Sequence, residues 1–187
     1  MFIPIGVDCG NAEFLKKHNI RSFSFPFDWV VSYNGISEII KNNFHSFIPK
    51  NSIKLNTEYQ ILFPHNEFPN DTEKILRRIE RFKNILETYQ EKITFIRKGH
   101  ASHHHKEHNN NTIKSDIIDA EELDNILKEK YPHLSYNIIV ILVCGKCFQS
   151  DIIYTTPHSD IKIYNIAKAD VDDPKYEALC IELFVKK

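Results

Sequence analysis

A cysteine near the start of the chain, Cys9, is the residue best placed for covalent chemistry. It lies between a short apolar run, Phe2–Val7, which predicts a strand, and Asn11–His18, which predicts a helix. A thiol at a helix start is close to unpaired backbone N–H groups and to the positive end of the helix dipole, and both favour the thiolate. The same N–H groups could bind an oxyanion during acyl transfer. Cys9 is therefore a candidate nucleophile; the alternative is a small buried apolar residue.

A nucleophilic cysteine needs a base within hydrogen-bond reach and a group that orients the base. His65 follows the predicted strand Tyr59–Phe63 and is the candidate base, with His100 in reserve, and Asp28 is a candidate orienting acid. Cys9, His65 and the turn near His100 each follow a predicted strand, so we expect them to share one rim of a sheet. In the alternative interpretation, His65 caps a turn and Asp28 anchors an aromatic loop.

A histidine-rich and asparagine-rich segment at about residues 99–114 predicts an exposed polar loop. Imidazoles bind transition metals, but a structural metal site needs fixed geometry and supporting partners, which a polar loop does not supply. We therefore predict no metal and no cofactor, and a metal-dependent enzyme that uses this loop ranks last among the alternatives. The five histidines are His100, His103, His104, His105 and His108.

Two other motifs carry weaker signals. Cys144 and Cys147 form one C-x-x-C pair, which is half of a zinc site without a second pair, so turn residues are the simpler interpretation. Arg77, Arg78 and Arg81 share one helix face and could contact phosphate or acidic substrate groups. A solvated face paired with neighbouring glutamates is the commoner outcome for such a cluster.

Hydrophobic periodicity predicts the elements that would position these groups. A long amphipathic helix is expected over Asp71–Gln90, and a second helix is expected to begin with Asp119 as its N-cap. A continuous apolar run, Asn137–Val143, is typical of a buried parallel strand. The remaining expected elements are a core-plugging aromatic segment at Arg21–Tyr33, a short helix at Ile36–Asn43, strands at Lys92–Arg97, Asp151–Thr155 and Ile161–Ile166, and a last helix from Pro174 to near Phe184.

The alternation of strands and helices predicts the fold class α/β. Repeated βαβ units make a mostly parallel sheet that is covered on both faces, so we expect a three-layer αβα sandwich. This architecture is SGNH-like or flavodoxin-like, in contrast to the α+β architecture of papain. Residues 1–187 show no convincing linker, and a single domain is expected.

Composition narrows the class of protein. The chain has 187 residues and a formal net charge of −1, which gives no overall field for nucleic acid or an anionic membrane. No P-loop, G-x-G-x-x-G or G-x-S-x-G motif is present. The apolar start is too short for a signal peptide or a transmembrane span, so we expect a cytoplasmic protein with free thiols.

Several sequence blocks resemble one known family, the putative papain-like cysteine peptidases. They are a Gly-x-x-Cys block at Gly6–Cys9, a Ser-x-Pro-Phe-Asp-Trp block at Ser24–Trp29, a His-x-x-Phe block at His65–Phe68, an Arg-Arg-Ile-x-Arg-Phe helix at Arg77–Phe82, and a Phe-x-Arg strand end at Phe95–Arg97. The resemblance implies that Cys9 is the nucleophile, His65 the base and Asp28 an orienting acid. Asp8 stands where relatives often have a neutral residue, and its carboxylate is expected to raise the pKa of Cys9.

A more distant similarity to esterase-like SGNH hydrolases bears on the fold alone. In those proteins an acid and a histidine near the carboxyl terminus complete the catalytic triad. His158 would have to take the place of that histidine in this chain.

Two functional hypotheses follow. The first is a cysteine-dependent hydrolase, peptidase-like, that cleaves or transfers an acyl group of a peptide, ester or protein substrate through Cys9 and His65. The second is a non-catalytic binding or interaction module on the same scaffold, viral or host-directed.

Overall fold

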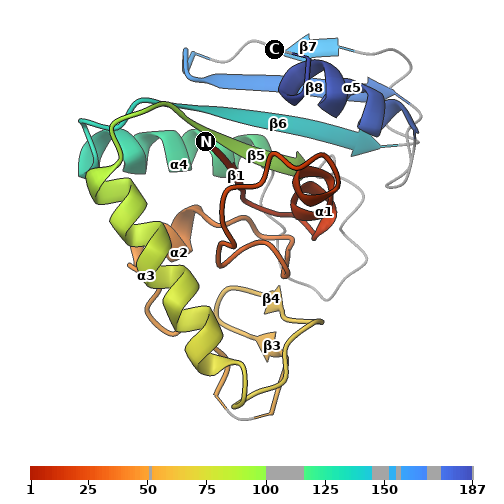
Figure 1. Ribbon diagram of the computed structural model, residues 1–187. Helices are drawn as coiled ribbons and strands as arrows, with labels where there is room; N and C mark the ends of the chain where they lie inside the picture. The colour runs from red at the N-terminus through yellow and green to blue at the C-terminus, as the bar shows by residue number, and fades with distance from the viewer. Residues whose placement is uncertain (51, 100–115, 145–151, 155–156, 168–173, 187) are drawn as a thin grey trace.

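A five-stranded sheet forms the centre of the computed structural model, which describes residues 1–50, 52–99, 116–144, 152–154, 157–167 and 174–186. The strand order is β1-β5-β6-β8-β7 (Figure 1). Neighbouring strands among the first four are parallel, and β7 is antiparallel to β8. The strands are β1 (Phe2–Pro4), β5 (Ile93–Gly99), β6 (Tyr136–Cys144), β8 (Ile161–Ala167) and β7 (Ile152–Tyr154).

Helices cover both faces of this sheet because successive side chains of a strand point to opposite faces. In β6, Ile139, Ile141 and Val143 belong to one buried cluster, which includes α1 (Gly10–Lys17) and α5 (Pro174–Phe184). The alternate β6 residues belong to a second cluster on the opposite face. That cluster includes α2 (Ser37–Lys41), α3 (Thr72–Thr88) and α4 (Asp116–Lys130). The predicted α/β class with a mostly parallel sheet between helices is confirmed.

A second, smaller sheet was not predicted. Its strands pair antiparallel in the order β2-β4-β3 and lie below the main sheet in Figure 1, with α3 running from one sheet toward the other. The strands are β2 (Val31–Ser32), β3 (Leu55–Asn56) and β4 (Ile61–Leu62). The expectation that Tyr59–Phe63 joins the parallel sheet is therefore wrong. A parallel pair needs a long crossover, whereas β3 and β4 are joined by a short turn in which Asn56 accepts the Tyr59 amide hydrogen, at 2.9 Å.

The aromatic segment after α1 plugs the core between α3 and the small sheet, as predicted. Phe25 and Phe27 are fully buried, and the Phe27 ring lies edge-on to the ring of Phe82 in α3, at a centroid distance of 5.7 Å. Phe23 is the exception, because 51% of it is exposed. The helices otherwise lie where periodicity placed them: α5 has the predicted ends, and the others differ from the predicted ranges at their ends.

The start of α4 shows one incorrect prediction. The helix begins at Asp116 rather than after Asp119. The Asp119 carboxylate accepts the backbone N–H groups of Ile36 and Ser37, at 2.9 to 3.1 Å, and so it caps α2 from another element. Within the ranges that the structure describes, no helix has the length and apolarity that crossing a bilayer would need.

Candidate functional site

Cys9 lies at the carboxyl end of β1, as the sequence predicted. Beyond β1 the chain stays hydrogen-bonded to β5, with Ile5 N to Ile96 O at 2.9 Å and Val7 N to Lys98 O at 2.8 Å. Cys9 is then the N-cap of α1, where its carbonyl accepts the Glu13 amide hydrogen at 2.9 Å. Its side chain makes no capping hydrogen bond and is partly exposed. The thiol is therefore presented at a helix start on the rim of a parallel sheet.

Three backbone amides follow Cys9 in the first turn of α1. The Gly10 amide hydrogen bonds to Asp8 Oδ1, at 2.8 Å. In the described part of the chain, the amide hydrogens of Asn11 and Ala12 have no acceptor, as is usual for the first turn of a helix. The Asn11 side chain fixes this turn, because its Nδ2 donates to the carbonyl oxygens of Gly6 and Ile96, each at 3.1 Å. These donors could stabilise an oxyanion next to Cys9.

The charges around Cys9 oppose the thiolate. Burial raises the pKa of Cys9 most, and the negative charges of Glu13 and Asp8 raise it further. Hydrogen bonding to the backbone at the helix start lowers the pKa, but this effect is the smallest. The expected effect of Asp8 is thus confirmed. The backbone at the helix start favours the thiolate, as expected, but burial and two carboxylates outweigh it, so the pKa of Cys9 is raised overall.

A buried lysine next to this turn was missed by the sequence reasoning. Lys98, at the end of β5, is only 3% exposed, and its Nζ lies 3.5 Å from Asp8 Oδ2. The same Nζ lies 4.8 Å from the ring centroid of Tyr176 in α5, and the Tyr176 hydroxyl donates to Asn11 Oδ1. The positive charge of Lys98 thus partly offsets the negative charge of Asp8, next to Cys9. The only available signal was a lysine at the end of an apolar strand.

The neighbouring residue, Arg97, hydrogen-bonds to the segment that leads from β1 to Cys9. It is fully buried, and its Nε donates to Asp116 Oδ1 at 2.5 Å. Nη1 donates to the Ile5 carbonyl at 2.8 Å, and Nη2 donates to the Ser32 carbonyl at 2.9 Å. One guanidinium thereby connects β5, the residue that follows β1, β2 and the start of α4.

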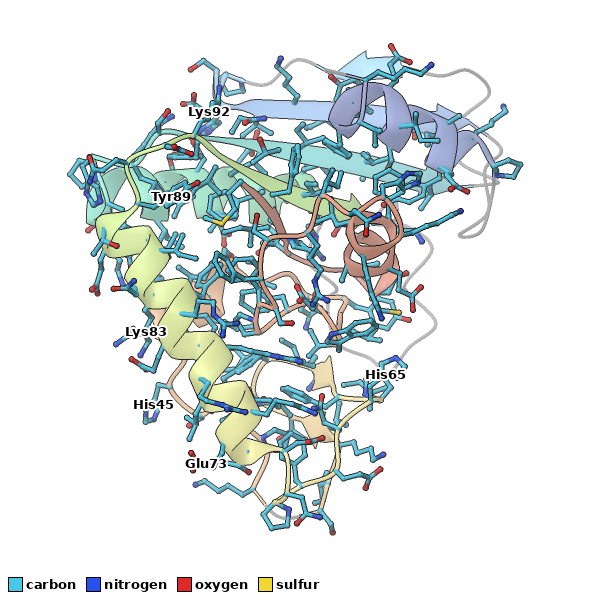
Figure 2. All side chains as sticks on the ribbon, viewed as in Figure 1. His45, His65, Glu73, Lys83, Tyr89 and Lys92 are labelled. Atoms are coloured by element: carbon cyan, nitrogen blue, oxygen red, sulfur yellow. The ribbon has the colours of Figure 1, made fainter. Side chains whose placement is uncertain are left out.

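His65 follows β4 of the small sheet, not a strand of the main sheet, so the shared sheet rim that we expected is not what positions it. Figure 2 shows its side chain beside the small sheet, on the side away from α3. Its ring packs edge-on against Trp29, at a centroid distance of 5.8 Å. No hydrogen bond joins His65 to Cys9 among the residues that the structure describes.

Asp28 anchors the aromatic segment. It is fully buried, pairs with Arg21, and accepts the Phe25 amide hydrogen at 2.9 Å. Burial raises the pKa of Asp28, whereas the Phe25 amide and Arg21 lower it. The Arg21 guanidinium also lies over the Trp29 ring, 5.6 Å from its centroid. Within the described ranges, Asp28 has no hydrogen bond to His65; Arg21 and Trp29 connect the two residues instead.

His158 does not join Cys9. His158 precedes β8, so it lies at the amino-end edge of the parallel sheet, where its Nδ1 lies 2.6 Å from Asp124 Oδ2. It therefore cannot serve as the triad histidine of an SGNH-type site at Cys9. His100 and the other histidines of the loop lie outside the described residues, as does Cys147. No metal-binding group of three or more histidine, cysteine or acidic residues occurs in the part that is described.

Comparison with known proteins points to the family that the motifs resemble. Residues 1–71, which include Cys9, Asp28 and His65, match the model of the family described as "Putative papain-like cysteine peptidase (DUF1796)". An uncharacterized protein of Acanthamoeba polyphaga mimivirus is 49% identical over 49 residues. This match spans 25% of the present chain and only 22% of the length of that relative. No solved structure matches the chain.

Proposed function

We propose that this chain is a cysteine-dependent hydrolase, peptidase-like, in which Cys9 attacks the carbonyl carbon of an amide or ester. The observation that carries the proposal is the partly exposed Cys9 thiol at the start of α1, next to the Asn11 and Ala12 amide hydrogens that have no acceptor among the described residues. The match of residues 1–71 to a family described as papain-like cysteine peptidases supports it. The substrate class is a peptide, ester or protein acyl group.

The chemistry begins with proton transfer because the raised pKa keeps the Cys9 thiol protonated at neutral pH. His65 accepts the thiol proton as Sγ bonds to the carbonyl carbon, and the oxyanion that forms accepts hydrogen bonds from the Asn11 and Ala12 amides. The imidazolium then gives its proton to the leaving amine or alkoxide. Water, deprotonated by His65, hydrolyses the thioester and restores the thiol.

His65 must come within one hydrogen bond or one bridging water of Cys9 for this role. The His65 side chain is exposed and is held on one side by the Trp29 ring. Catalytic hydrogen bonds are often long without substrate and shorten in the complex. Asp28 is a positioning residue in this scheme, since it fixes Arg21 and the segment that carries Trp29.

Acylation of the protein tests the proposal. We expect p-nitrophenyl acetate to acetylate Cys9, as detected by intact mass and peptide mapping. We expect the His65→Ala variant to slow this step by about 100-fold or more, as removal of a general base does. His45→Ala is the matched control, because His45 is another exposed histidine of the same half of the chain. Equal rates of acetylation for His65→Ala and the unmodified protein would show that His65 is not the base. Absence of acetyl-Cys9 would contradict the proposal that the protein is a cysteine-dependent hydrolase.

A non-catalytic interaction module is the second candidate. The observation that favours it is the acidic surroundings of Cys9, whose thiol is held protonated by burial, Glu13 and Asp8. In such a module, Cys9 would react with iodoacetamide at pH 7 no faster than N-acetylcysteine does. A hydrolase requires the opposite result, a faster reaction that depends on His65.

A further inference from the structure

The guanidinium groups of α3 do not form the solvated, glutamate-paired face that is usual for such clusters. Arg77 is exposed, but Arg78 and Arg81 turn toward the segment after α1, where Arg21 lies. These positions lie on the stretch of α3 between Glu73 and Lys83, which are labelled in Figure 2. Arg81 Nη1 donates to the Ser24 carbonyl at 2.7 Å, and its guanidinium lies 5.5 Å from the ring centroid of Phe23.

The charges in this cluster do not balance. Three guanidinium groups, from Arg21, Arg78 and Arg81, share this cluster with one buried carboxylate, that of Asp28, which pairs with Arg21. The next acid, Asp71, pairs with Lys74 at 2.7 Å. An excess of two positive charges therefore stays in a partly buried place, where like charges repel more strongly than they do in water.

Arg78 is the arginine of this cluster whose donors stay open to solvent, since none of its nitrogens is among the buried polar atoms that lack a partner in the described part of the chain. Its guanidinium is half-buried, and among the residues described it forms no hydrogen bond and no ion pair. Burial lowers the pKa of Arg78, the Asp28 carboxylate raises it, and the nearby charges of Arg21 and Arg81 lower it. Its N–H donors can therefore bind an anion that enters from solvent, and such an anion would offset the repulsion among the three guanidinium groups.

We propose that Arg78 and Arg81, with Arg21 behind them, bind the phosphate group of a phosphate monoester. A phosphate monoester carries close to two negative charges at neutral pH, which matches the excess of two positive charges. Arginine also presents paired N–H donors that fit phosphate oxygens. The exposed Phe23 ring, over which Arg81 lies, gives the ligand an apolar surface next to the phosphate. This site is separate from the chemistry proposed for Cys9.

Inorganic phosphate is the probe for this site. At constant ionic strength, adjusted with sodium chloride at pH 7.5, we expect phosphate to raise the midpoint of thermal unfolding, because a ligand that binds the folded state stabilises it. Arg78→Gln should weaken the phosphate affinity by about 10-fold or more, as loss of a charge-assisted bond does. Arg77→Gln is the matched control, and its affinity should stay within about 2-fold of the unmodified protein.

A second readout does not depend on the ligand. In phosphate-free buffer, Arg78→Gln should leave the unfolding midpoint within about 1 °C of that of Arg77→Gln, because Arg78 makes no hydrogen bond or ion pair in the described part of the chain and a solvent-exposed charge contributes little to stability. A lower midpoint would mean that Arg78 makes a structural contact, and this would overturn the proposal. Equal losses of affinity in Arg77→Gln and Arg78→Gln would show general screening of charge, and tighter binding of malonate than of phosphate would show a carboxylate site. Either result would also overturn it.

Discussion

Replacing Arg97 by methionine perturbs the buried connection under the Cys9 turn while filling much of the same volume. The guanidinium is fully buried and makes a 2.5 Å contact with Asp116 and bonds of 2.8 and 2.9 Å with the carbonyls of Ile5 and Ser32. Breaking a buried ion pair on one side costs about 3–5 kcal/mol. Each buried carbonyl that loses its donor adds about 1 kcal/mol or more.

We therefore expect Arg97→Met to lower the free energy of unfolding by about 5 kcal/mol. For a chain of this length that is a fall of about 10–20 °C in the unfolding midpoint. Urea unfolding followed by circular dichroism and by the fluorescence of Trp29, the single tryptophan of the chain, measures the loss. The exposed Arg77→Met variant is the matched control and should change stability by less than about 0.5 kcal/mol.

A double variant, Arg97→Met with Asp116→Leu, separates the ion pair from general damage to the core. Because it leaves no charge buried without a partner, it should recover a large part of the loss. The reasoning is refuted if Arg97→Met costs less than about 1 kcal/mol. It is equally refuted if the double variant loses the simple sum of the two single losses.

The remaining predictions concern the charges and thiols of the molecule. Asp8→Asn and Glu13→Gln should each lower the pKa of Cys9, because each removes a negative charge that disfavours the thiolate; the rate of iodoacetamide alkylation against pH measures this shift, and an unchanged profile would contradict it. Lys98→Met should move the same profile to higher pH, since it leaves the Asp8 carboxylate without the cation 3.5 Å away. Cys180 should resist alkylation in the folded protein and react only after unfolding, because it is buried and burial raises its pKa to about 12; labelling of native Cys180 at the rate of Cys9 would show that α5 detaches. Asp124 should make stability fall in acid. Burial opposes ionisation of Asp124, but hydrogen bonds from Lys128, Tyr136 and His158 lower its pKa in the folded state, so its stabilisation is present above the unfolded pKa of about 4 and is lost as the pH falls through the folded value. Asp124→Asn should flatten the loss of stability between about pH 5 and pH 2 in urea titrations, and an unchanged slope would exclude this carboxylate as the cause.

The sequence predicted the elements whose signals are local. The apolar spacing along Asp71–Gln90 predicted α3, and the apolar run Asn137–Val143 predicted the central strand β6. The place of Cys9 between a strand and a helix was equally local, because it depends only on the residues on either side. These patterns persist in the fold since each element must bury its own apolar face.

The charges of the candidate site could not be predicted in the same way. Lys98 and Asp8 meet because β1 pairs with β5, and Arg97 meets Asp116 from a different element. Asp119 illustrates the same limit, since it was expected to cap its own helix and instead caps α2, more than eighty residues earlier in the chain. A short polar side chain bonds to whichever backbone group packing brings near, and periodicity does not encode that neighbour.

The sequence by itself determined that this chain forms a mostly parallel sheet between helices and that Cys9 stands at a helix start. The sequence also placed the Asp8 carboxylate beside Cys9. Only the tertiary structure decided that a buried lysine lies 3.5 Å from Asp8 and that, within the described ranges, no imidazole is hydrogen-bonded to the Cys9 thiol. It also decided that Arg77 faces water while Arg78, one residue later, faces Arg21. The physical reason is distance along the chain. Hydrophobic patterning acts between neighbours in sequence, whereas the electrostatic field of a site is the sum of charges that only packing brings together.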